Sequence, residues 1–194
     1  MLLDNIELKK EDKNKTACLI FWLKSMKNFK EYVPYLIIIV VVLLVKKFVV
    51  TPVIVSGDSM YSTLHNKDIM ILNRLYKTKD IKRYDIIVIK YNNKNIIKRV
   101  IGLPGDSIEC IDNQLYINGE IIKEDYLDEG TITNDFSLQE LFDVDYVPEG
   151  VYFVLGDNRE VSLDSRSIGF IEPKNIEGKA TLTIFPFNRF GNKK

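Results

Sequence analysis

The chain has 194 residues, 46% of them hydrophobic, and its 27 Lys and Arg residues balance 27 Asp and Glu residues. This length suffices for one modest domain with a core plus an anchor, and the balanced charge favours no nucleic-acid partner. One histidine and two cysteines are too few for a zinc site built from His and Cys clusters, so we expect no metal ion and no other cofactor.

Residues 1–31 form a polar segment with seven lysines against five acids. This composition fits either a short amphipathic segment on a membrane surface, with residues 20–23 as its apolar part, or a disordered tail. Positive charge before an apolar span favours a cytoplasmic location, so we expect the N-terminus inside the cell.

Residues 33–45 are uninterruptedly apolar, and after two lysines the apolar character continues to residue 50. A helix of that extent would be about 27 Å long, close to the hydrocarbon thickness of a bilayer. Pro52 marks its end. We therefore predict one transmembrane helix over residues 32–50, which leaves residues 51–194 outside the cytoplasm.

Short β-like runs separated by turns make up the chain beyond the anchor. Asn118-Gly119 between two apolar runs predicts a hairpin. No helical period of any length follows residue 56, so we predict a mainly β, antiparallel domain. Cys110 and Cys18 would lie on opposite sides of the membrane, so they cannot pair, and Cys110 is expected to be a buried hydrophobe. The predicted strands cover residues 49–55, 68–73, 85–91, 96–101, 107–111, 114–117, 151–155 and 180–185.

Ser59 stands in residues 55–64, VSGDSMYSTL, between a glycine turn and bulky side chains. This arrangement fits a presented nucleophile, although Gly-Asp-Ser is also a common surface turn. His65 is a poor base for a Ser-His-Asp triad, because neighbouring residues of one turn rarely meet across a cleft. We expect His65 to be a solvated loop residue.

Lys98 lies in residues 96–106, IIKRVIGLPGD, inside an apolar run typical of a strand. Side chains alternate faces along a strand, so Lys98 shares its face with Ile96 and Val100. An apolar face removes hydration from the ammonium group and lowers its pKa toward that of a general base. The alternative is a lysine at a sheet edge whose amine reaches water.

Residues 156–170, GDNREVSLDSRSIGF, form a third distinctive block. The three blocks, in this order, resemble the type I signal peptidases, which are membrane-bound serine proteases with a serine and lysine dyad, and most closely the compact Gram-positive members. The resemblance runs from about residue 35 to about residue 186. It implies a coiled, antiparallel β-sheet catalytic domain anchored by a single pass in the cell membrane.

The same resemblance implies how a peptide bond would be cut. Ser59 Oγ would attack the scissile carbonyl, and neutral Lys98 would take its proton and later pass one to the leaving amine. The backbone N–H of Ser59 is the expected oxyanion donor. Some members add a hydroxyl two residues earlier, but Gly57 stands there.

Five residues of the third block have implied supporting roles. Ser162 would hydrogen-bond Lys98 and orient it. Asp164 and Arg166 would pair to hold their loop, and Asp157 and Arg159 would brace the same region. The alternative is an ordinary turn with surface ion pairs, each worth about 0 to 1 kcal/mol.

The chain departs from the family pattern at two positions of these blocks. Ser62 stands where the family usually has proline, which would loosen the turn after the nucleophile. Val161 stands where it usually has asparagine. Neither departure removes a group that the dyad requires.

Residues 124–149 contain nine acids and no basic residue. We interpret them as the family's variable insert and favour a solvated loop, because the acids lack the spacing of a known calcium loop.

Five apolar side chains near the anchor are either core or a patch that dips into the outer leaflet and contacts membrane-held substrate. The substrates implied by the resemblance are secretory preproteins with small residues at the first and third positions before the cut, and the protein export machinery is a further implied partner. Alternatives are a self-cleaving repressor, which would carry a DNA-binding domain, and a non-catalytic membrane-anchored β-domain that binds or scaffolds. The patch residues are Ile54, Val55, Met60, Tyr61 and Leu64.

Overall fold

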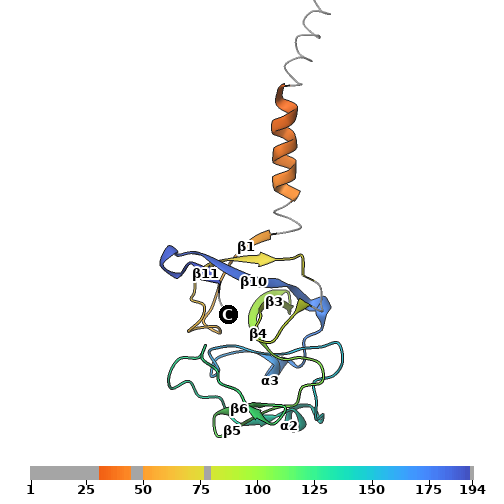
Figure 1. Cartoon of the computed structure of the whole chain (residues 1–194), viewed down its shortest axis with the longest axis vertical. Helices are drawn as coiled ribbons and strands as arrows, with labels where there is room; N and C mark the ends of the chain where they lie inside the picture. Colours follow the sequence, from red (N-terminus) through yellow and green to blue (C-terminus); the bar gives the residue numbers. More distant parts are fainter. Residues whose placement is uncertain (1–30, 45–49, 77–79, 193–194) are drawn as a thin grey trace, which may run out of the picture. The chain divides into compact units, whose positions relative to one another are not determined.

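The structure is a computed structural model that describes residues 31–44, 50–76 and 80–192. The chain divides into two units, residues 1–46 and 47–194. In the first unit a helix, drawn in orange in Figure 1, covers residues 31–44 and exposes its apolar side chains. Within the described residues, none of the helices has the length and apolar content needed to cross a membrane.

The predicted helix over residues 32–50 overlaps this helix, while residues 45–49 lie outside the described residues, as do Cys18 and nearly all of the lysine-rich segment. Its predicted C-terminal end is wrong, because Val50 already begins strand β1 (Val50–Ile54). Pro52 lies inside this strand rather than at a helix end. A proline is tolerated there because β1 is an edge strand, where a missing backbone N–H breaks no ladder.

The second unit is mainly β, as the alternating runs predict, and its paired strands are antiparallel. In the described part of this unit, a seven-stranded sheet has the order β1-β2-β10-β3-β4-β9, with β11 added on β10. Its further strands are β2 (Ile69–Asn73), β3 (Ile86–Tyr91), β4 (Lys94–Gly102), β9 (Phe153–Leu155), β10 (Ile176–Phe185) and β11 (Gly191–Asn192).

A second sheet of the described residues has the order β7-β6-β5-β8. Asn118 and Gly119 join β6 to β7 with positive φ values of 55° and 77°, so the predicted hairpin is confirmed. Figure 1 shows β5, β6 and helix α2 grouped together at the opposite end of this unit from β1 and β10. These elements are β5 (Ile108–Ile111), β6 (Gln114–Ile117), β7 (Glu120–Ile121), β8 (Phe136–Ser137) and α2 (Leu138–Phe142).

Strand β4 lies between β3 and β9 and is packed on both faces. Val100 belongs to a core cluster with β3 and β9, while Ile101 belongs to the cluster that fills the second sheet. Cys110 is 1% exposed in the latter cluster, which confirms it as a buried hydrophobe. The polar side chains in the middle of β4 are therefore far from water.

The acidic residues 124–149 are not a solvated loop throughout, and this prediction is wrong in part. Phe136, Leu138 and Val147 are buried in the core cluster of the second sheet. These three side chains point inward between acids that mostly face water, while Ile132 and Tyr146 are exposed. A count of charged residues could not predict these buried side chains, because it does not show which face each residue occupies.

Candidate active site

The turn that carries Ser59 is held by buried anchors on both sides. Val55, Met60 and Leu64 are 3%, 2% and 0% exposed and belong to one core cluster. The backbone N–H of Leu64 donates to the carbonyl of Met60 (2.8 Å), which closes the turn. The predicted apolar patch therefore divides, because these three side chains are core and only Ile54 and Tyr61 are exposed.

Lys98 and Ser59 meet although they are 39 positions apart. Lys98 Nζ lies 2.6 Å from Ser59 Oγ. The alternative of an edge lysine that reaches water is wrong, because Lys98 is 1% exposed on an internal strand. Burial lowers the pKa of Lys98 to about 8, against the opposing pull of the Asp164 and Asp157 carboxylates. A neutral fraction of about a tenth at pH 7, far above that of an ordinary lysine, makes this amine a usable base.

The third sequence block reaches the nucleophile through Gly156. A Cβ at this position would lie 2.1 Å from Ser162 Oγ and 2.5 Å from the backbone oxygen of Ser59. The next segment also contacts the turn, because the backbone N–H of Asn158 donates to Ser59 O (3.1 Å). Only glycine permits this close approach.

The predicted hydrogen bond between Ser162 and Lys98 is absent. Ser162 Oγ is buried and has no hydrogen-bond partner among the described residues. Ser162 still lies close to the Ser59 turn, with Gly156 between its hydroxyl and the backbone oxygen of Ser59. The predicted partner of the hydroxyl, Lys98, is therefore wrong.

Asp164 and Arg166 pair in the structure. Arg166 donates through Nε to Oδ1 and through Nη2 to Oδ2 of Asp164, both at 2.9 Å. Asp164 also caps the short helix α3 (Ser165–Ile168) and accepts the backbone N–H of Gly156 (3.0 Å). The pair thus holds the backbone that touches the nucleophile turn.

Asp157 and Arg159 are each paired, but with partners outside the third block. Asp157 accepts from Arg99 Nε (2.9 Å) and Nη2 (2.6 Å), and neither side chain is more than 1% exposed. Arg159 binds Glu124. The alternative of surface ion pairs is therefore wrong for this region.

Sequence reasoning missed Arg99, Glu124 and Tyr126 as parts of the site. Arg99 follows Lys98 in the same apolar run, so the burial argument made for the lysine would have found it. Glu124 lies 35 positions from its partner Arg159, and no local pattern reports such a contact.

Ser62 was predicted to loosen the turn after Ser59, but in the structure its side chain is held by a hydrogen bond. Its φ is 90°, and its hydroxyl donates to the backbone oxygen of Tyr126 (2.9 Å). Proline fixes φ near −65°, so it could not adopt this conformation. Val161 is the second departure from the family pattern. Its side chain is 66% exposed and takes part in none of these contacts.

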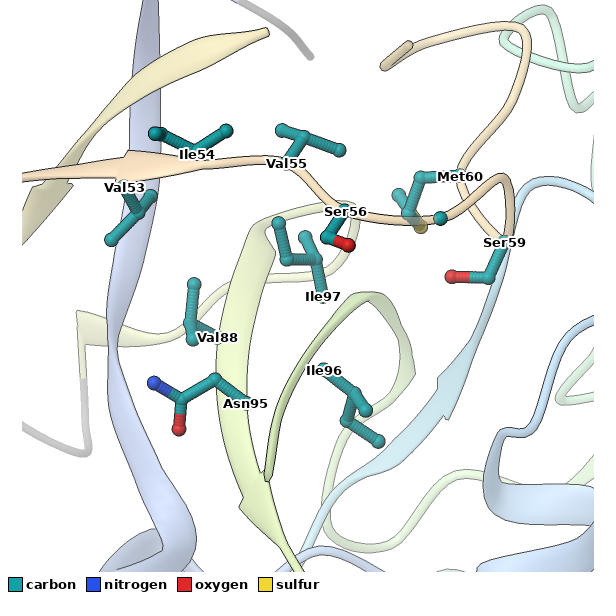
Figure 2. Close-up of a pocket in the computed structure, with 11 residues that line it drawn as sticks. Val53, Ile54, Val55, Ser56, Ser59, Met60, Val88, Asn95, Ile96 and Ile97 are labelled. Atoms are coloured by element: carbon teal, nitrogen blue, oxygen red, sulfur yellow. The ribbon is translucent and has the colours of Figure 1, made fainter. Parts of the chain in front are cut away.

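A cavity of about 290 Å³ opens beside Ser59, between the end of β1 and the start of β4. Figure 2 shows Ser59 at one end of its mainly apolar lining. The polar side chains in the lining are Ser56, Ser59 and Asn95. Its remaining residues are Val53, Ile54, Val55, Gly57, Met60, Val88, Ile96 and Ile97.

His65 takes no part in this arrangement. Its ring packs on Tyr61 with a centroid distance of 4.9 Å, and it is half-buried rather than fully solvated. Within the described part of the chain, no group of three or more His, Cys, Asp or Glu side chains could hold a metal ion.

Comparison with known proteins identifies the family to which the chain belongs. The family model described as "Signal peptidase, peptidase S26" matches residues 29–185. The chain is 35% identical over 196 residues to "Signal peptidase I" of Bacillus amyloliquefaciens, covering 95% of this chain and 98% of the relative. It is 41% identical over 166 residues to "Signal peptidase I" of Bacillus caldolyticus, covering 81% and 91%. A crystal structure of a signal peptidase I from Enterococcus faecalis V583 matches at 42% identity with a TM-score of 0.48, covering 52% of this chain and 97% of that chain.

These matches span most of the chain and show an enzyme of the serine protease class. The chain belongs to the signal peptidase family, peptidase S26. The resemblance inferred from the three sequence blocks is confirmed, and the non-catalytic β-domain is set aside.

Proposed function

We propose that the chain is a membrane-anchored endopeptidase that removes signal peptides from secretory preproteins, with Ser59 as nucleophile and Lys98 as general base. One observation carries the assignment of the dyad. Lys98 Nζ lies 2.6 Å from Ser59 Oγ, on a strand that excludes water and lowers the pKa of the lysine. A nucleophile within hydrogen-bond reach of a neutral base is the geometry that acyl transfer needs.

Each proton in the proposed reaction has a place to go. Neutral Lys98 takes the proton of Ser59 as Oγ attacks the carbonyl carbon, and the ammonium then protonates the leaving amine. The resulting ester is hydrolysed by a water molecule that Lys98 deprotonates in turn. The backbone N–H of Ser59 is the proposed donor to the oxyanion, because Gly57 offers no side-chain hydroxyl.

The cavity beside Ser59 is the proposed place for the residues before the cut. An extended peptide would run between residues 53–57 and residues 95–97, where it adds to the strands on either side. The mainly apolar lining and modest volume favour small, uncharged side chains. This agrees with preproteins that carry alanine-like residues at the first and third positions before the cut.

The membrane anchor is proposed from the apolar run at residues 33–45 and from the exposed apolar side chains of the helix over residues 31–44. A lipid-facing helix presents such a surface. The preceding lysines favour a cytoplasmic N-terminus and an extracytoplasmic catalytic domain in a single-pass protein of the cell membrane. The export machinery, which delivers preproteins to this side, is a proposed neighbour.

The test is cleavage of a secretory preprotein by the full-length chain in lipid, with the new N-terminus read by mass spectrometry. We expect one cut after a small-x-small sequence, lost in both Ser59→Ala and Lys98→Ala. Lys94→Ala is the matched control, because Lys94 is an exposed lysine of the same strand. Cleavage retained by either dyad variant would contradict the proposal.

A further inference from the structure

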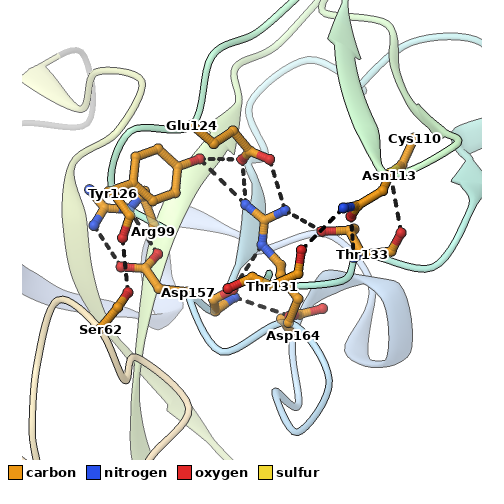
Figure 3. Close-up of polar contacts among 12 residues, drawn as sticks. Ser62, Arg99, Cys110, Asn113, Glu124, Tyr126, Thr131, Thr133, Asp157 and Asp164 are labelled. Carbon is orange, nitrogen blue, oxygen red and sulfur yellow. Dashed lines mark hydrogen bonds and ion pairs between the residues drawn. The ribbon is translucent and has the colours of Figure 1, made fainter. Parts of the chain in front are cut away.

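Glu124 and Tyr126 belong to the acidic segment, yet their side chains reach a buried polar cluster that includes Arg99 (Figure 3). The Glu124 side chain is 11% exposed and accepts from Arg159 through Nη1 (3.1 Å) and through Nη2. The Tyr126 hydroxyl donates to the same carboxylate. The dyad mechanism uses neither residue.

Through Arg159, Glu124 reaches the backbone beside the nucleophile. Arg159 is fully buried and donates through Nε to the carbonyl of Gly156 (3.1 Å). Gly156 is the residue whose Cα packs against Ser59 O. A buried guanidinium without a counter-charge is costly, so Glu124 stabilises Arg159 in the position that this contact needs.

The aromatic ring of Tyr126 packs against β4, the strand that carries Lys98. The Arg99 guanidinium carbon lies 4.0 Å from the centroid of the Tyr126 ring. Arg99 directly follows Lys98, and its Nη2 donates to Thr63 Oγ1 (3.0 Å) four residues after Ser59. A desolvated cation is attracted to an aromatic face, so the ring helps to hold Arg99 in the rotamer that also pairs with Asp157.

Through its backbone, Tyr126 reaches the nucleophile turn itself. The Ser62 hydroxyl donates to Tyr126 O, and the positive φ of Ser62 directs the chain toward this contact. Tyr126 therefore contacts the neighbours of both dyad residues, which come from separate parts of the chain.

We infer that Tyr126, held in place by Glu124, is a positioning residue that keeps Ser59 and Lys98 at reacting distance. It does so by clamping Arg99 with its ring and the Ser59 turn with its carbonyl. The inference rests on the proposed function. It assigns to the acidic segment a part in catalysis without contact with the substrate.

The test is preprotein cleavage by the full-length chain in lipid, with kcat and KM measured separately. Tyr126→Leu removes the ring but keeps the carbonyl, and we expect kcat to fall about tenfold while KM stays within about twofold. Tyr126→Phe keeps the ring on Arg99 but loses the hydroxyl bond to Glu124, so kcat should recover to within about threefold of the unmodified chain rather than fully. Tyr116→Leu is the matched control, because Tyr116 is a half-buried tyrosine of β6 whose hydroxyl bonds Gln114.

Normal kcat in Tyr126→Leu, or a Tyr126→Phe variant as slow as Tyr126→Leu, would overturn the inference. If Lys98→Ala is inactive in the same assay, the proposed function survives that result, whereas an active Lys98→Ala removes the proposed function itself. Should Tyr126→Leu not fold, as judged by circular dichroism, Ser62→Ala tests the other arm of the clamp. It should lower kcat about threefold, and an unchanged kcat would overturn the inference.

Discussion

The Ser59 and Lys98 pair lies between two unlike surroundings. On one side is the mainly apolar cavity of about 290 Å³. On the other side, each of three arginines is paired with a carboxylate inside the protein. The pairs are Arg99 with Asp157, Arg159 with Glu124, and Arg166 with Asp164.

The difference separates two tasks. The apolar side offers space and little polarity, so it determines which side chains bind. The charged side is held together by its own buried ion pairs, so it determines where the reacting atoms lie. Because each nearby carboxylate has an arginine, Lys98 forms no ion pair among the described residues, and burial is the largest influence on its pKa, ahead of the charges of Asp164, Asp157 and Arg166.

The largest expected effect is on the charged side, in Arg99→Met. This substitution leaves Asp157 buried without its counter-charge, and breaking a buried pair in this way costs about 3 to 5 kcal/mol. The measurement is the unfolding free energy of the full-length chain in detergent, from urea titration. Arg74→Met is the control, because the Arg74 and Glu177 side chains are 38% and 30% exposed and such a pair contributes about 0 to 1 kcal/mol. Equal losses in both variants would show that the charged side is not a structural support.

Gly156→Ala attacks the junction between the charged side and the nucleophile. Its Cβ would overlap both Ser162 Oγ and the backbone oxygen of Ser59, so the turn must move. A displacement of about 1 Å lowers kcat roughly 100-fold. Gly119→Ala is the control, because it places alanine at a strained positive φ (77°) but the added Cβ has no neighbour within 4 Å. A Gly156→Ala variant with normal kcat would show that the contact does not set the position of Ser59.

The two surroundings were not equally predictable from the sequence. Strands β3 and β4 have local alternation and flanking turns, so their positions were predicted within two residues, and the burial of Lys98 followed. The contacts of Arg99 and Arg159 join residues 58 and 35 positions apart, and alternation carries no information on such pairs. Helix α2 and strand β8 are too short for a period to show. Glu124 does lie in a loop, but its pairing with Arg159, which removes its side chain from water, could not be predicted.

The pH dependence of activity tests how the ion pairs of the charged side affect the pKa of Lys98. Only the neutral amine of Lys98 accepts a proton, and the lysine is protonated below its pKa of about 8. The ratio kcat/KM should therefore rise with pH through this value, reaching about a tenth of its plateau at pH 7. Arg166→Met should move this limb to higher pH, because the positive charge of Arg166 lowers the pKa of Lys98 while Asp164 raises it. A limb that moves to lower pH in this variant would contradict the role given to the ion pairs.

The smallest expected effect is on the apolar side, in Ile97→Ala. Ile97 is half-buried and lines the cavity, so its truncation makes room for a larger side chain before the cut. In a competition between two peptides with alanine or valine at that position, we expect the preference for alanine to fall about threefold, because a few methylene contacts change discrimination only modestly. The rate on the alanine peptide should change less than the preference, since Ile97 packs on the cluster that anchors the Ser59 turn but makes no hydrogen bond to the dyad. Ile111→Ala is the control, because Ile111 is an exposed isoleucine of the second sheet. If Ile97→Ala instead lowers kcat and leaves the preference for alanine over valine unchanged, Ile97 belongs to the residues that hold the dyad. The division of tasks between the two sides would then not hold at this position.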